Sequence, residues 1–144
     1  MKVSRTVTYA VQALLQLSQY QGGAPIPCNR LAREGRMPER FLLQILRDLV
    51  NSGILQSVRG VEGGYRLARS IDEVTLEDVF EAVDSPLIAS VPPLDEMPDK
   101  ARETMLRTVN QIAASVREQL RSVRLADLVD SQAEEQKSAV LRAI

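Results

Sequence analysis

Three arginines and three glycines stand together in one short stretch of this sequence, SVRGVEGGYRLAR at residues 57–69. Guanidinium groups bind phosphates and the guanine edge through paired hydrogen bonds. Glycines adopt the positive φ angles that a tight connection between two strands requires. The stretch therefore predicts a basic β-hairpin with strands at 54–59 and 65–68. Its positive charge favours binding to a polyanion. The alternative is an ordinary solvated turn.

A second group of polar side chains precedes the hairpin, on a helix predicted to begin at Pro38 and to end at Gly53. Four apolar residues recur at helical spacing and are expected to face the core: Leu42, Ile45, Leu46 and Leu49. Five residues are left facing outward: Glu39, Arg40, Leu43, Gln44 and Arg47. Arginine pairs with guanine or phosphate, glutamine with adenine, and leucine contacts only a thymine methyl. The alternative is a plain solvated helix face.

Further contacts with a DNA duplex are expected from the hairpin and from the start of the chain. Arg59 and Arg66 on the hairpin strands, with Arg69 after them, suit a narrow minor groove or phosphates. Glycines at the hairpin tip let the backbone approach closely. Near the start of the chain, the amide dipoles behind Ser4, together with Arg5 and Tyr9, predict a phosphate seat.

Charge is divided unequally between the two halves of the chain. The 144 residues have a net charge of −1. Residues 1–70 nevertheless carry ten basic and four acidic side chains, a net charge of +6, whereas 71–144 carry eight and fifteen, a net charge of −7. A basic half followed by an acidic one is typical of a polyanion-binding module joined to another element. Double-stranded DNA is the expected partner of the first half.

The residue types present exclude most catalytic chemistry. Histidine is absent, and Cys28 is the only cysteine. Imidazole ligands and imidazole bases are therefore excluded, and a thiol-dependent enzyme would lack a resolving partner. We expect no enzyme, no metal site and no cofactor. Because the sequence has neither an apolar run of about 18 residues nor a signal peptide, we expect a cytoplasmic protein without a membrane partner.

The elements that must position these residues follow from the apolar pattern. Helices are expected at 4–20, with Ser4 as N-cap, and at 28–34. A capping-box signature, TLED at 75–78, opens a further helix that ends near residue 84. Three helices followed by a hairpin predict a winged helix-turn-helix, a mainly α fold with a small β-hairpin.

A long helix is predicted at 99–123, after a Pro-rich loop at 85–98. Its apolar stripe repeats every three or four residues: Met105, Val109, Ile112, Val116, Leu120 and Val123. Because a helix this long extends past so small a domain, pairing with a second subunit is favoured over packing on its own domain. The predicted organisation is a DNA-binding domain at 1–84, the loop, and a dimerisation helix with a C-terminal tail at 99–144. A short helix is expected within that tail, at 124–136.

Three segments resemble the Rrf-two family of bacterial transcriptional regulators: MKVSRTVTYAVQALLQLS, LAREGRMPERFLLQILRDLVNSGILQSVRGVEGGYRLAR and VTLEDVFEAVD. The resemblance covers nearly the whole chain, and SVRGVEGGYRL is its most specific part. It implies a homodimer joined through the long helix, one winged domain on each half-site of a pseudo-palindromic operator, and repression of nearby genes. It also implies Tyr9 near phosphate and Arg59 in the minor groove. Arg40 and Gln44 fall on the recognition helix, which is the helix predicted to begin at Pro38. On the same helix, Leu43 stands where iron–sulfur members often carry an acid.

The expected function is therefore a sequence-specific DNA-binding regulator. The predicted contact residues are Ser4, Arg5, Tyr9, Arg36, Glu39, Arg40, Leu43, Gln44, Arg47, Arg59, Gly60, Gly63, Gly64 and Arg66. The alternative is a winged-helix protein-interaction module without DNA binding, against which the charge of +6 argues.

The resemblance also bears on the signal that such a regulator detects. Cluster-binding members carry three cysteines between the fourth helix and the long helix, but 85–98 contains none. Thr8 stands where some members use an acid, and Asp95 and Glu96 alone would make a poor cluster site. The chain therefore resembles the cluster-free branch, in which the effector is a small molecule, a partner protein or a thiol.

Two features are candidates for receiving that signal. Cys28 lies near a predicted helix N-terminus beside Arg30, and both would favour a redox-active thiolate; the alternative is a half-buried packing residue. The Pro-rich loop offers an apolar effector surface or a cap over the dimer core, through Leu87, Ile88, Val91 and Leu94.

Overall fold

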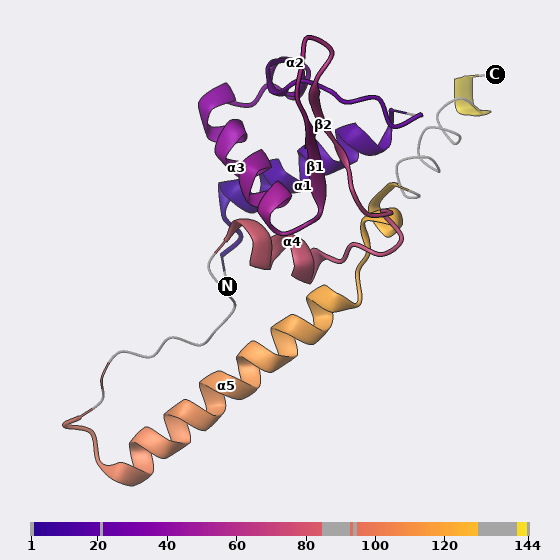
Figure 1. Ribbon diagram of the computed structural model, residues 1–144. Coiled ribbons are helices and arrows are strands. Elements are labelled where there is room, and N and C mark those ends of the chain that lie inside the picture. Colours follow the sequence, from indigo (N-terminus) through magenta and orange to yellow (C-terminus); the bar gives the residue numbers. More distant parts are fainter. Residues whose placement is uncertain (1, 21, 85–92, 94, 130–140, 144) are drawn as a thin grey trace.

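The computed structural model describes residues 2–20, 22–84, 93, 95–129 and 141–143. Its main elements in chain order are α1 (Arg5–Ser18), α2 (Cys28–Gly35), α3 (Glu39–Asn51), β1 (Leu55–Val58), β2 (Gly64–Leu67), α4 (Leu76–Val83) and α5 (Asp99–Arg121) (Figure 1). This confirms the expected mainly α fold with a small hairpin. The apolar residues predicted in the Pro-rich loop, Leu87, Ile88, Val91 and Leu94, lie outside the described residues, as does most of the helix predicted at 124–136.

Helices α1, α2 and α3 surround the core because each turns an apolar face inward. All four residues predicted to face inward on α3 are at most 1% exposed: Leu42, Ile45, Leu46 and Leu49. Ser4 caps α1 as expected, since its Oγ accepts a hydrogen bond from the Val7 amide at 3.3 Å. Pro38 is the N-cap of α3, with an extended backbone, so that helix begins one residue later than predicted.

The turn between α2 and α3 depends on a contact from α1. Arg36 adopts a left-handed conformation, φ 52°, and its amide donates to the last carbonyls of α2. Beside it, Gln12 Nε2 donates to the Gly35 carbonyl at 2.7 Å. A Cβ at Gly35 would lie 2.7 Å from the side chains of both Gln12 and Met37. The glycine therefore lets α1 approach the turn and fix the angle between α2 and α3.

The hairpin is tied to the chain before α2. Strands β1 and β2 pair antiparallel, from Leu55 opposite Leu67 to Val58 opposite Gly64. Ile26 adds an isolated bridge, in which Ile26 and Tyr65 exchange two backbone hydrogen bonds of 2.9 Å. Gly64 has φ +154°, and a Cβ there would overlap the Ile26 carbonyl. The hairpin therefore has a fixed position relative to the helices.

The chain returns to the core after the long helix. Helix α5 ends at Arg121, and the Val123 carbonyl accepts a hydrogen bond from the Leu76 amide at 2.9 Å. Leu125 is fully buried in the same core as α1 and α3. Val123 was expected on the long helix as part of the dimerisation stripe, but the helix ends before it, and its carbonyl pairs with the start of α4. Residues 125–129 form one further helical turn.

Helix α5 extends away from the other helices (Figure 1). None of its residues is buried. Met105, Leu106 and Ile112 are 43%, 38% and 59% exposed. A stripe of large apolar side chains on one subunit is thus left in solvent. Within the described residues, no helix combines the length and apolarity needed to span a membrane.

Candidate nucleic-acid interface

The outer face of α3 carries the predicted base-contacting residues. Glu39, Arg40, Gln44 and Arg47 are exposed, and Leu43 is half-buried. Arg40 and Arg47 form no ion pair within the part of the chain that the structure describes. Gln44 Nε2 donates to Asp48 Oδ1 at 3.1 Å, a contact between successive turns of the helix. The amide of Gln44 must exchange this partner to hydrogen-bond a base edge.

The two predicted hairpin arginines lie on different parts of the wing. Arg66 stands opposite Gln56 and donates from Nε to Gln56 Oε1 at 3.0 Å. Successive strand residues face opposite sides, so Tyr65 and Ser57, which pair with each other, lie on the other face. Arg59 is exposed and follows the last residue of β1, not on the strand as expected. Arg59 and Arg66 therefore do not form one pair of neighbouring cations on the hairpin.

Arg69, which was also expected to contact DNA, makes contacts within the protein. Its Nη2 donates to the Glu73 carbonyl at 3.3 Å, and its Nη1 lies 3.6 Å from a carboxylate oxygen of Asp78. Glu73 belongs to the segment leading into α4, and Asp78 lies in the first turn of that helix. Arg69 consequently ties the end of the hairpin to that segment.

The three glycines of the wing have different environments. Gly60 has φ +116° and open space where a Cβ would lie. A Cβ at Gly63 would overlap the Val58 carbonyl, and Gly64 contacts Ile26 as described above. Gly63 and Gly64 are therefore required by contacts within the protein, whereas the space beside Gly60 is open. The close approach to a duplex expected of all three glycines stays a prediction.

An open pocket of about 380 Å³ lies between α3 and the wing. Its lining residues are Arg47, Val50, Asn51, Ser57, Arg59 and Tyr65. Both arginines were predicted from the sequence as contact residues, whereas Asn51, Ser57 and Tyr65 were not. The signal was present in the spacing, because Asn51 lies one helical turn after Arg47, and Ser57 lies two residues before Arg59.

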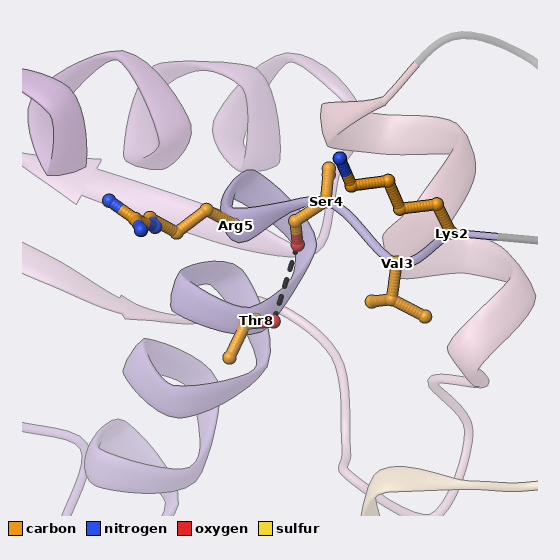
Figure 2. Close-up of a pocket in the computed structure, with 5 residues that line it drawn as sticks. All are labelled: Lys2, Val3, Ser4, Arg5 and Thr8. Atoms are coloured by element: carbon orange, nitrogen blue, oxygen red, sulfur yellow. Dashed lines mark hydrogen bonds between the residues drawn. The ribbon is translucent and has the colours of Figure 1, made fainter.

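The start of α1, where a phosphate seat was predicted from Ser4, Arg5 and Tyr9, also carries a carboxylate. The Ser4 hydroxyl donates to Asp84 Oδ2 at 3.0 Å, so a carboxylate already lies at this helix end. A pocket of about 680 Å³ is lined by Lys2, Val3, Ser4, Arg5 and Thr8. Figure 2 shows the side chains of Lys2 and Arg5 reaching to different sides of this pocket. The two cations therefore do not converge on one anion, and Arg5 is exposed.

Tyr9 connects α1 to the recognition helix. Its ring packs edge-to-face on Phe41 of α3, with centroids 5.8 Å apart and planes 77° apart. Phe41 is 42% exposed, so the pair lies at the surface. Arg36 is also exposed, at the turn that precedes α3. Both predicted contact residues thus border the outer face of α3.

Cys28 does not have the environment expected of a reactive thiolate. Burial and the nearby Glu39 carboxylate raise the pKa of the thiol. Arg30, which was expected to lower this pKa, instead donates from Nε to Glu34 Oε1 at 2.9 Å and stacks 5.0 Å above the Tyr20 ring. The thiol faces the Glu39 carbonyl at 3.8 Å. Of the two features expected to favour a thiolate, Arg30 is therefore engaged elsewhere, while Cys28 still lies at the N-terminus of α2.

Three packed helices that carry an exposed basic helix beside a hairpin define a winged helix-turn-helix protein. The chain belongs to the Rrf2 family, called Rrf-two above. Residues 3–131 match the family model, whose description is an iron-dependent transcriptional regulator. The protein is accordingly a transcriptional regulator with a DNA-binding fold, and it is not an enzyme.

Individual relatives agree with this assignment. The HTH-type protein Rv1287 of Mycobacterium tuberculosis is 37% identical over 131 residues, which cover 89% of this chain and 81% of that protein. The HTH-type transcriptional regulator CymR of Bacillus subtilis is 30% identical over 128 residues, 89% of each chain. The solved structure of CymR, the global cysteine regulator of B. subtilis, gives a TM-score of 0.70 at 28% identity, covering 91% of this chain and 98% of that one. T. potens IscR gives 0.71 at 28% identity, with coverages of 94% and 91%.

The family description implies iron, and the side chains of this protein do not fit an iron–sulfur cluster. Such clusters are held by several thiolates, with histidine as the usual substitute. The sequence has one cysteine and no histidine. Among the described residues, no three His, Cys, Asp or Glu side chains are grouped so that they could hold a metal ion.

Proposed function

We propose that this protein is a homodimeric repressor that binds a pseudo-palindromic operator and carries no iron–sulfur cluster. The observation that carries the proposal is the outer face of α3, where Arg40, Gln44 and Arg47 are exposed beside Arg59 of the wing. Exposed guanidinium groups without carboxylate partners keep their full charge available for phosphates and guanine edges. A bound dimer that covers a promoter excludes RNA polymerase, and for this reason we propose repression.

The contact residues divide by role. Arg40 and Gln44 are proposed to contact base edges, with Leu43 beside a thymine methyl and Glu39 beside cytosine. Backbone contacts, which carry little sequence information, are proposed for exposed or half-buried positions: Arg5, Tyr9, Arg36, Arg47, Gly60 and Arg66. Arg59 is proposed to enter the minor groove.

The proposal of a dimer rests on the length and the apolar stripe of α5. A helix of 23 residues is about 35 Å long. On its stripe, Met105 and Ile112 are exposed in one subunit, and Val109 and Val116 are half-buried. Leu120 continues this stripe into an apolar groove of about 360 Å³ between α1 and α4. The groove is lined by Val3, Val7, Thr8, Val11, Leu76, Phe80, Leu120 and Leu128. A second α5 laid along the stripe would bury both surfaces.

The experiment is selection of bound fragments from genomic DNA with the purified protein, followed by hydroxyl-radical footprinting. We expect two protected half-sites related by two-fold symmetry, with centres a whole number of helical turns, or multiples of about 10 bp, apart. In vitro transcription from a promoter next to the fragment should fall when the protein is added. A single asymmetric footprint would contradict the dimer, and retention of no fragment would favour the protein-interaction module.

The absence of a cluster is tested separately. We expect protein purified without oxygen to contain no stoichiometric iron or sulfide and to bind the selected fragment with unchanged affinity after treatment with a chelator. Stoichiometric iron with loss of binding on chelation would contradict this part of the proposal.

A further inference from the structure

The apolar groove of about 360 Å³ lies where the long helix joins the winged unit. Its floor is formed by Val7 of α1 and Phe80 of α4, which are only 2% and 6% exposed. Half-buried aliphatic side chains from α1, α4 and the end of α5 form its walls. Thr8 is the one polar side chain among the described residues that line it, and its hydroxyl donates to the Ser4 carbonyl at 3.2 Å. The groove therefore has the chemistry of a site for an aliphatic chain.

A cationic pocket adjoins this groove, since Val3 and Thr8 line both. It is the pocket of about 680 Å³ at the start of α1 (Figure 2). The cations that line it are Lys2 and Arg5. Neither forms an ion pair within the described part of the chain. Asp84, which binds the Ser4 hydroxyl, is not among the lining residues of either pocket. An apolar groove thus opens into a pocket of positive charge, an arrangement that complements a molecule with a hydrocarbon chain and an anionic head.

We propose that the groove and the cationic pocket together bind an aliphatic carboxylate, and that this ligand is an effector of the regulator. Its hydrocarbon chain lies on the floor of Val7 and Phe80, and its carboxylate lies in the cationic pocket. In the proposed dimer, the second α5 passes the mouth of the groove at Leu120 and covers the chain. The ligand then contacts both α1, which supports the turn before α3, and the end of the helix that joins the two subunits. The effector role rests on the proposed function, whereas binding of the carboxylate does not.

The experiment is isothermal titration calorimetry of the full chain with hexanoate, octanoate and decanoate, each below the concentration at which it forms micelles. If the chain enters the groove, each added methylene should tighten binding by about fourfold. Octanol is the neutral match for octanoate. Replacing both Lys2 and Arg5 by alanine should lower the affinity for octanoate relative to octanol by up to about fivefold, the range for an exposed ion pair, and should keep the dependence on chain length. Equal binding of all three acids, or an unchanged preference in the double variant, would overturn the proposal.

Matched variants separate the site from general effects of charge and folding. Val3 lines both pockets and is 53% exposed, so Val3→Asp places a like charge at their junction without disturbing the core. This variant should lose octanoate binding. Val61→Asp makes the same change at a fully exposed valine of the wing and should bind normally. Replacing Arg33 and Arg107 by alanine removes two exposed cations elsewhere and should also leave binding unchanged. Thermal melts without ligand confirm that each variant is folded.

The effector role is tested by measuring the affinity for the selected duplex with and without octanoate. An allosteric ligand should change this affinity by about fivefold or more in wild type and leave it unchanged in Val3→Asp. Octanoate binding without any such change overturns the effector role. A wild-type dimer that takes up none of the three acids means that the second subunit fills the groove, and this overturns the site itself. Failure of the wild type to bind any duplex overturns the proposed function, while the calorimetry still decides whether the carboxylate binds.

Discussion

The carboxylate of Glu77 on α4 accepts two hydrogen bonds from the guanidinium of Arg121 on α5, from Nε at 2.6 Å and from Nη2 at 3.0 Å. Glu77 is only 8% exposed and is the one buried charged residue in the described part of the chain. The pair joins the last helix of the winged unit to the last turn of the long helix. A bidentate pair restrains orientation as well as distance, so it fixes the direction in which α5 leaves the winged unit.

The first prediction concerns the pH dependence of stability. Arg121 lowers the pKa of Glu77 by hydrogen bonding to its charged form. A carboxylate with a lowered pKa stabilises the folded state above its ordinary pKa, about 4.3, and this stabilisation is lost as the pH falls below that value, through the lowered pKa of the folded state. Glu77→Gln should therefore lower the Tm at pH 7 and reduce the fall in Tm as the pH is taken from about 5 to below 4. Glu103→Gln, on the exposed surface of α5, is the control and should leave the profile unchanged.

The second prediction separates two wing glycines. Gly64→Ala places a Cβ against the Ile26 carbonyl and strains a positive φ, whereas Gly60→Ala strains φ alone in open space. Backbone strain costs about 1 to 3 kcal/mol, and overlap with backbone adds to it. Urea denaturation should thus show a clearly larger loss of unfolding free energy for Gly64→Ala. Equal losses would mean that the contact with Ile26 is not maintained in solution.

The third prediction concerns the apolar stripe of α5. Ile112 is 59% exposed in a single subunit but is expected at the centre of the dimer. Ile112→Asp should convert the dimer to a monomer in sedimentation velocity, since it buries a charge without a partner. Operator affinity should fall at the same time, because each half-site is then bound separately. Gln111→Asp changes a neighbouring exposed position by one charge and should remain dimeric; monomers of both wild type and Ile112→Asp would refute the interface.

A fourth prediction tests base recognition. Gln44→Ala removes the amide proposed to contact adenine and should relax the preference at one base pair of each half-site. A bidentate contact is worth about 1 to 3 kcal/mol of discrimination, so affinities for the four base pairs at that position should become nearly equal. Asp48→Ala frees the Gln44 amide from its intrahelical partner and should keep the preference. If Gln44→Ala weakens all sequences equally, Gln44 does not contact a base.

The fifth prediction is that Cys28 remains a protonated thiol at neutral pH. Burial and Glu39 raise its pKa, so alkylation by iodoacetamide at pH 7.5 should be slower than that of a free cysteine and should accelerate at higher pH. Glu39→Gln removes one cause and should increase the rate, while Glu34→Gln should not. Peroxide should then affect DNA binding equally in wild type and Cys28→Ser. A loss confined to wild type would restore the thiol as a redox switch.

The structure could be predicted from the sequence where a regular repeat of apolar residues determines which face of a helix points inward. The inward residues of α3 were predictable because four leucine and isoleucine side chains repeat at helical spacing, and the capping box at Thr75 and Asp78 is a local pattern. Ser4 was correctly predicted as a cap for the same reason. These features depend on neighbours within one or two helical turns.

Long-range partners were not predictable from the same pattern. Asp84 accepts a hydrogen bond from Ser4, which lies 80 positions earlier in the chain. Ile26, which precedes α2, forms a bridge with Tyr65 of the hairpin. Arg69 is a basic residue of the kind that contacts DNA, but its guanidinium group is bound by the Glu73 carbonyl and the Asp78 carboxylate. An arginine's availability depends on which carboxylates the fold brings near it, which local spacing does not determine.

The central claim is tested most directly by the salt dependence of binding to the selected duplex. Each neutralised phosphate contributes about 0.9 to the slope of log K against log[NaCl], so a dimer with at least three backbone contacts per half-site should lose about a thousandfold in affinity between 50 and 200 mM NaCl. An affinity that changes by less than about threefold over this range would show that the exposed arginines of α3 and the wing do not face DNA phosphates.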